Sequence, residues 1–310
     1  MTLCALEAVC INAVDVFILV SGFFLVTSDK RTIGKPLNLL FMTMLFKLFS
    51  NLISSVIKGV IPSVGIMLTW LLPNNYFVIF YITLYLISPY INIIVQKLTK
   101  QQYQFLLMMV LLLFSIWNFV FDFVGRTTSV GSIPDICTIC RYGADDGYNI
   151  VNFAFLYLIG GYLRLHGVSI SRSKIVMLLL ASIVAICGLM CLETWLTGGF
   201  ALGTALSYHS PFVIMSATFT FLLFNGLSIN SKVINSLSKA AFTCFLIQGM
   251  FFSRLDIPRY VGSSIWLMVL HLLASIVIIY IAAYCVNYVY NVIFGKLFAK
   301  LDKNRIPYFE

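Results

Sequence analysis

Nine apolar stretches run along this 310-residue chain, and they constrain its fold more than any other feature of the sequence. Most of them approach the ~20 residues that a helix needs to cross the hydrocarbon core of a bilayer. They lie at 9–27, 37–57, 76–95, 104–121, 150–165, 175–196, 211–227, 240–253 and 264–294. Hydrophobic residues make up 61% of the chain and charged residues only 10%, which is more apolar surface than a soluble domain can bury. The sequence therefore predicts an all-α, polytopic membrane protein with a single domain over residues 1–310.

The segments between these stretches alternate in charge, and the alternation predicts how the chain lies in the membrane. Basic residues gather in every second loop and after the last stretch, at 30–35, 97–100, 164–174, 232–239 and 296–305. The loop at 122–149 is instead rich in aspartate, and the loop at 254–263 is the one weak point of the pattern. By the positive-inside rule, the basic segments and the C-terminus are cytoplasmic and the 122–149 loop is external. The stretch at 60–73, framed by Pro62 and Pro73, fits a re-entrant or interfacial piece.

The net charge of +9 comes from these short loops. It indicates contact with anionic membrane lipid, and we expect no nucleic-acid partner. Cys137 and Cys140 form a C-x-x-C pair, but no second pair and no histidine stands at zinc spacing, so no metal site is predicted. The odd number of spans places the start of the first stretch outside the cell. A ten-helix protein that lacks its first helix accounts for this more simply than a nine-helix protein.

Five motifs, in the same order, resemble those of the membrane acyltransferase-3 family, which contains bacterial surface-glycan O-acyltransferases. Residues 14–24 read VDVFILVSGFF and are similar to the family's FFxxSGF/Y signature. Residues 84–92 read LYLISPYIN and resemble its LYLLSPxLN helix, and residues 156–164 read LYLIGGYLR and resemble its LYLIGxYLR element. The other two similar segments are 208–212 and 238–248, where Gln248 stands in place of the histidine that usually ends the last motif.

The resemblance implies a ten-helix fold and an acyl transfer reaction. The acyl group, expected to be acetyl, would move from acyl-CoA (acetyl-CoA) as co-substrate to a hydroxyl of a cell-surface polysaccharide or of its lipid-linked precursor, with no bound cofactor. The family's first helix carries an arginine and the presumed catalytic histidine, and nothing before Asp15 matches it. One expectation is therefore a chain that is inactive by itself. The alternative is a flippase, polymerase or small transporter of the same glycan pathway, although no internal repeat of the transporter kind is evident.

Two charged residues are expected deep in the membrane, where such groups are costly. Asp15 lies about 18 Å from the cytoplasmic end of the first stretch, and Lys47 lies about 15 Å from the same side in the second. The similar depths predict an Asp15–Lys47 ion pair, which would be either structural or part of a substrate site. Ser21 and Gly22 form either a close-packing face between helices or a contact with the acyl donor or acceptor.

Histidine and tyrosine side chains supply the remaining candidates for the reaction and the glycan. Of the three histidines, only His209, at the outer end of its helix, is placed to substitute as a general base. Tyr81 and Tyr85 belong to a stripe that is either an interfacial belt or part of a glycan site. From the resemblance we also assign Asn152 and Gln248 to the substrate. The acyl-CoA donor is assigned to four basic residues that are predicted to be cytoplasmic: Lys30, Lys35, Arg31 and Arg164.

Overall fold

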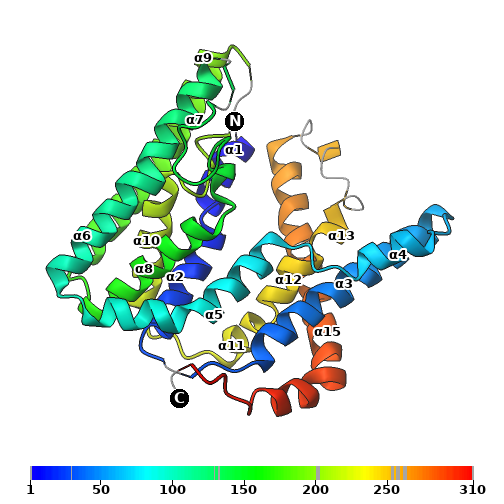
Figure 1. Ribbon diagram of the computed structural model, residues 1–310. Helices are drawn as coiled ribbons and strands as arrows, with labels where there is room; N and C mark the ends of the chain where they lie inside the picture. Colours follow the sequence, from blue (N-terminus) through cyan, green and yellow to red (C-terminus); the bar gives the residue numbers. More distant parts are fainter. Residues whose placement is uncertain are drawn as a thin grey trace. The chain divides into compact units, whose positions relative to one another are not determined.

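The computed structural model describes residues 2–28, 30–128, 130–131, 133–199, 203–252, 255, 259–260 and 264–308 (Figure 1). All regular elements in these ranges are helices, apart from one isolated bridge between Thr32 and Arg305. Six helical runs are long and apolar enough to cross a membrane, and Ile150–His166 and Pro211–Asn225 are shorter apolar helices. The predicted all-α, multi-pass membrane fold is therefore confirmed. The orientation of the C-terminus stays a prediction.

The chain divides into two compact units. The first unit comprises Met1–Arg31 and Ile79–Leu227, and the second comprises Thr32–Val78 and Ser228–Glu310. Each unit is thus built from two separate segments of the sequence. The single-domain organisation stays a prediction, and the two units are described one at a time.

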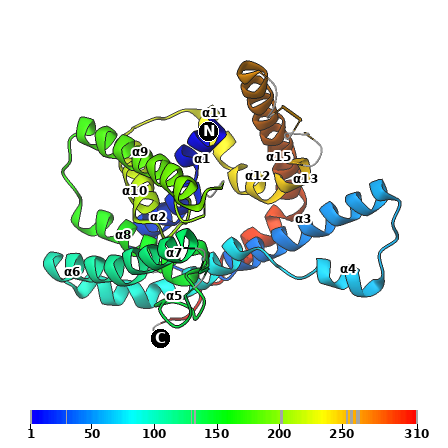
Figure 2. The same cartoon turned by 90° about the horizontal axis from the view of Figure 1, so that it is seen from above.

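The first unit is a helical bundle centred on α2, which packs against α8 and α10 (Figures 1 and 2). Its elements are α1 (Thr2–Cys10), α2 (Ala13–Leu25), most of α5 (Tyr76–Lys97), α6 (Lys100–Val110), the π-helix η1 (Leu111–Ile116), α7 (Trp117–Thr127), the 3₁₀ turn η2 (Asp145–Gly147), α8 (Ile150–His166), α9 (Arg172–Thr197) and α10 (Pro211–Asn225). Helix α9 packs on α10 and also contacts α1 and α7.

Small residues bring α2 and α8 into backbone contact. A Cβ on Gly22 would lie 2.3 Å from the carbonyl oxygen of Tyr157, and a Cβ on Gly160 would lie 2.2 Å from that of Leu19. Distances this short exclude a side chain at either position, so both glycines are needed for the close approach. The expected close-packing role is confirmed for Gly22, because helices in lipid associate through such small residues. A substrate role for Ser21 stays a prediction.

The second unit is held together by aromatic side chains. It contains α3 (Gly34–Lys58), α4 (Val64–Trp70), α11 (Lys232–Ser238), α12 (Ala241–Ile247), α13 (Gly249–Phe252) and α15 (Ile265–Leu301). Phe46 of α3 and Tyr290 and Phe298 of α15 are buried in one cluster with Ile247 of α12. The predicted re-entrant stretch at 60–73 forms the short helix α4, which Ser63 caps at its N-terminus.

Three predicted spans differ from the structure. The stretch at 9–27 is divided between α1 and α2, and Asn12 at this break donates hydrogen bonds to Ser216 and Thr220 of α10. The stretch at 240–253 is divided between α12 and α13, next to Gly249. Glycine is unfavourable in the interior of a helix. The last helix continues to Leu301, because Phe298 still contributes to the aromatic cluster. The loop at 254–263 lies mostly outside the described residues.

Candidate active site

A polar cavity of about 280 Å³ lies in the first unit, beside the end of α7 that the loop charges predict to be external. Asp122 and Arg126 of α7 line it, and because they are four residues apart they share one face of the helix. Asp145 and Asp146 of η2 line it from the loop that follows, together with Tyr142. The cavity therefore offers carboxylates, a guanidinium group and a phenol, all of which hydrogen bond to hydroxyl groups.

The loop that forms this cavity is pressed against the segment before α10. Asp145 and Asp146 have positive φ angles of 49° and 50°, which are uncommon for residues other than glycine. Gly147, with φ 86°, has no room for a side chain, because a Cβ there would lie 2.5 Å from the backbone nitrogen of His209. The Tyr208 N–H donates to the Asp146 carbonyl at 2.8 Å. This strained turn is thus fixed where it meets His209, as is common at functional sites.

Two side chains hold the carboxylate of Asp146 at the cavity. Arg126 donates to it at 2.5 Å and Ser207 at 3.1 Å. Asp146 therefore joins α7 to the loop before α10, and Arg126 is positioned by its ion pair as well as by its helix.

His209 is fully buried directly behind the cavity wall. Its Nε2 lies 3.3 Å from Oδ2 of Asp122, whose side chain is 15% exposed. The His209 carbonyl accepts a hydrogen bond of 2.7 Å from Ser115, a residue of the π-helical segment η1. Segments of this kind are frequent at functional sites. The group that a ligand in the cavity would meet is therefore the carboxylate of Asp122. The His209 ring lies behind it in the interior, and among the described residues neither of its ring nitrogens makes a hydrogen bond.

The sequence prediction named His209 but missed Asp122, Arg126 and Asp146. Asp122 and His209 are far apart in the chain, and no short motif links them. The one signal was the cluster of aspartates in the loop at 122–149, together with the spacing of Asp122 and Arg126.

A second polar cluster surrounds Arg31, which is fully buried beyond the C-terminal end of α2. Its Nε and Nη2 donate to the Ser88 hydroxyl at 3.1 and 2.9 Å. Its other hydrogen bonds go to the carbonyls of Leu25, Ser28 and Lys30. A guanidinium group has five N–H groups, and these five bonds employ all of them. Arg31 thus orders the segment that follows the C-terminal end of α2. Its contact with acyl-CoA stays a prediction.

Aromatic residues extend this cluster across α5 and α8. The Arg31 guanidinium lies over the ring of Tyr85, 5.4 Å from its centroid. The Tyr157 hydroxyl donates to Asn92 at 2.8 Å, and the Asn92 amide donates to the Leu25 carbonyl at 2.8 Å. Tyr85 is buried, so in this structure it forms part of the interior and not an interfacial belt.

Other predicted residues of the first unit lie along α2, α5 and α8. The Ser21 hydroxyl donates to the Phe17 carbonyl at 3.0 Å and is hydrogen-bonded to Tyr81. Asp15 is fully buried, and neither of its carboxylate oxygens has a hydrogen-bond partner among the described residues. Within the same residues, the buried side-chain nitrogen of Asn152 also has no partner. Their substrate roles stay predictions. Arg164 is exposed and lies over the ring of Phe23.

The remaining predicted residues lie apart from this site. Lys47 belongs to the second unit and donates to the carbonyls of Thr69 and Leu72 at 2.9 and 3.1 Å, at the end of α4. Because Asp15 belongs to the first unit, their ion pair stays a prediction. Gln248 is at the junction of α12 and α13. The exposed Lys30 and Lys35 belong to different units, so the structure leaves their donor role a prediction as well.

The described residues thus combine a polytopic helical fold with a charged cavity and a buried histidine behind it. Residues 4–290 match the family of the acyltransferase domain. The chain therefore belongs to the membrane acyltransferase-3 family and is an acyltransferase by class. No curated protein and no solved structure matches it.

Proposed function

We propose that this chain is an O-acyltransferase that binds a glycan hydroxyl in the polar cavity of the first unit. The acceptor is a cell-surface polysaccharide or its lipid-linked precursor, and the donor is acyl-CoA, with acetyl as the group transferred. The observation that carries the proposal is the position of Asp122, which lines the cavity and lies 3.3 Å from the buried His209. Membership of the acyltransferase family supplies the reaction class.

In this proposal Asp122 is the general base. Its carboxylate accepts the proton of the acceptor hydroxyl while the hydroxyl oxygen attacks the carbonyl carbon of the acyl thioester. The new C–O bond forms, the C–S bond breaks and the CoA thiolate leaves. The proton held by Asp122 then passes through water to the thiolate, which gives CoA and restores the carboxylate. His209 is a positioning residue that orients Asp122 from the protein interior. General-base catalysis contributes about 10²–10⁴-fold to such reactions.

The other groups of the cavity would orient the sugar. Asp145 and Asp146 can accept hydrogen bonds from its hydroxyls, and Arg126 can donate to its ring and hydroxyl oxygens. Tyr142 is exposed and offers an aromatic face to the apolar side of a sugar ring. For the donor, the phosphates of CoA would contact exposed basic side chains that are predicted to be cytoplasmic, Lys30 and Arg164 of the first unit or Lys35 of the second. The proposed transfer therefore requires the acyl thioester to reach the cavity at the opposite, predicted external end of the first unit.

The test is the O-acetyl content of envelope glycans, measured by proton NMR in cells that have no O-acetyltransferase of their own. Expression of the chain should raise this content, which would contradict the expectation that the chain is inactive by itself. Asp122→Asn should lower the rate of acetylation about 10²-fold or more. Asp135→Asn is the matched control, because Asp135 belongs to the same loop but forms only an exposed pair with Arg141. Equal acetylation by the Asp122 and Asp135 variants, at equal protein levels, would refute the proposed site.

A further inference from the structure

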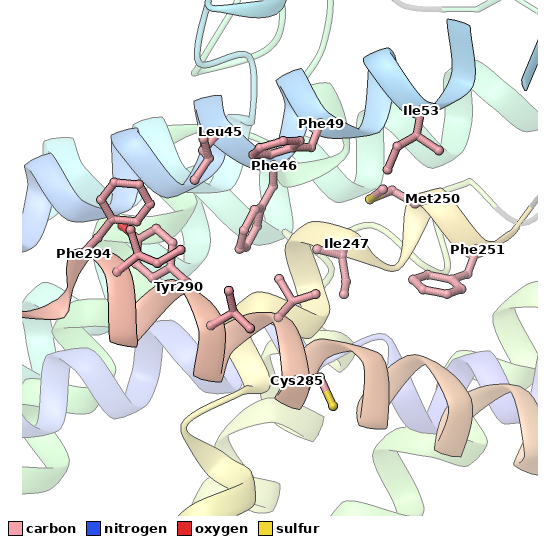
Figure 3. Close-up of a pocket in the computed structure, with 13 residues that line it drawn as sticks. Leu45, Phe46, Phe49, Ile53, Ile247, Met250, Phe251, Cys285, Tyr290 and Phe294 are labelled. Carbon is pink, nitrogen blue, oxygen red and sulfur yellow. The ribbon is translucent and has the colours of Figure 1, made fainter. Parts of the chain in front are cut away.

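Two cavities of the second unit have opposite chemistry and share one residue. An apolar cavity of about 550 Å³ is lined by residues of α3, α12, α13 and α15. Figure 3 shows Phe46 of α3, Ile247 of α12 and Met250 of α13 pointing into a common space beside α15. A polar cavity of about 580 Å³ lies along α3, α12 and α15 as well, and is also bordered by Ser236 of α11. Tyr290 lines both cavities.

Tyr290 marks the boundary between the two environments. Its ring packs edge-on against Phe46, with centroids 6.0 Å apart, on the apolar side. Its hydroxyl donates to Asn38, which lines the polar cavity, at 2.5 Å. A ligand that occupied both cavities would therefore need an apolar part on one side of Tyr290 and a polar part on the other.

The polar cavity contains one charged side chain, Lys239, and no acidic one. Among the described residues, the Lys239 ammonium group has neither an ion pair nor a hydrogen bond. Amides and hydroxyls supply the rest of its polar lining, and Thr243 and Asn291 both donate to the side-chain oxygen of Asn287. The cavity is thus rich in hydrogen-bond donors and carries one positive charge, which suits a phosphate with attached hydroxyls.

The apolar cavity is open to the surroundings of the protein. Phe49, Val289 and Ile293 line it and are exposed, so in a membrane protein they face lipid chains. The polar cavity begins at Asn38 and Lys239, near the ends of α3 and α12 that the loop charges predict to be cytoplasmic. Basic pockets between membrane helices on the cytoplasmic side bind anionic lipid headgroups.

From this arrangement we propose that the second unit binds one anionic phospholipid of the cytoplasmic leaflet. The phosphate and its glycerol hydroxyls occupy the polar cavity beside Lys239, and an acyl chain occupies the apolar cavity past Tyr290. The proposal is independent of the acyl transfer reaction, because every residue that it uses lies in the second unit.

The test uses the full chain in detergent and native mass spectrometry, with titration of phosphatidylglycerol against phosphatidylcholine. The unmodified chain should retain one phosphatidylglycerol in preference to phosphatidylcholine. Lys239→Gln should weaken phosphatidylglycerol binding about fivefold, the usual contribution of one basic residue near a membrane surface. Lys232→Gln is the matched control, because Lys232 is an exposed lysine of neighbouring α11 that does not line the cavity.

A second pair of variants tests the apolar half. Val289→Trp fills part of the cavity and should weaken binding on the order of tenfold, the effect of excluding about two methylene groups. Val292→Trp is its control, because Val292 is an exposed valine on the same helix outside the lining. Equal binding of the two lipids would overturn the proposal, as would equal effects of a variant and its control. Displacement of the lipid by acetyl-CoA, or a dimer that forms in its place and responds to the same variants, would assign the cavities to those occupants instead.

Discussion

The two units of this protein bury different kinds of side chain. All but three of the buried polar side chains of the described residues belong to the first unit, and they include Asp15, Arg31 and His209. The three in the second unit are the hydroxyl residues Thr43, Thr243 and Ser275. Both units bury aromatic rings, and in the second unit two of these, Phe46 and Tyr290, line cavities of about 550 and 580 Å³.

This contrast suggests a different function for each unit. Polar and ionisable groups inside a membrane protein are costly and mark functional sites, so their concentration assigns the chemistry to the first unit. Close contact between backbones at Gly22 and Gly160 keeps those groups in place. Among the described residues, the second unit buries only three polar side chains and has one apolar and one polar cavity, which suits it to an amphipathic lipid. The predictions below test this difference, from the largest expected effect to the smallest.

Gly160→Ala should destabilise the protein most. The added methyl would lie 2.2 Å from the Leu19 carbonyl oxygen, so α2 and α8 must move apart; overpacking of this severity costs about 3 kcal/mol. Gly295→Ala in α15 is the matched change in the second unit, where the nearest atom would lie 3.8 Å away. It should be neutral or stabilise by up to about 1 kcal/mol. Thermal unfolding in detergent compares the two variants, and equal melting temperatures would remove the contrast in packing.

Arg31→Lys should have the next largest effect. Lysine keeps the charge but cannot reproduce the planar five-donor fork, so Ser88 or one of the carbonyls loses its partner. The expected loss in unfolding free energy is about 2 kcal/mol, typical of hydrogen bonds to charged groups. Arg164→Lys, at an exposed site, should change stability by less than about 0.5 kcal/mol. If Arg31→Lys and Arg164→Lys have the same melting temperature, Arg31 does not order the end of α2.

Lys47→Met should have the smallest effect of the three. It removes the donor to the carbonyls of Thr69 and Leu72, and net losses of this kind are about 1 kcal/mol. The effect should be local, so hydrogen exchange should accelerate in α4 while the rest of the second unit is unchanged. Lys58→Met, at the exposed end of α3, provides the control. Unchanged exchange in α4 would show that Lys47 does not cap this helix.

Hydropathy predicted the helical fold well, because a membrane span must be apolar over most of its length. It did not predict the interruption beside Gly249, since a break within an apolar run leaves mean hydropathy unchanged. Nor did it predict the extension to Leu301, where Lys296 and Lys300 resemble a loop but Phe298 joins the aromatic cluster. The close packing at Gly22 was predictable because small residues have one clear use between membrane helices.

The candidate site was less accessible to sequence reasoning. His209 stood out because histidines are few, but its partner Asp122 comes from a distant helix. Only the fold brings them together. Arg31 was expected to be available to a donor because it stands in a loop, yet it is fully buried and hydrogen-bonded. Residue type and loop position therefore indicate which groups are present, and the packing around each group determines what it can contact.

The central claim, that Asp122 and His209 act as one unit, is tested most directly by a double-mutant cycle on the rate of glycan acetylation. Asp122→Asn and His209→Asn should each lower the rate about 10²-fold or more. The double variant should be no slower than Asp122→Asn alone, because residues that act together have non-additive effects. Multiplied losses in the double variant, or full activity of His209→Asn at equal protein levels, would contradict the account.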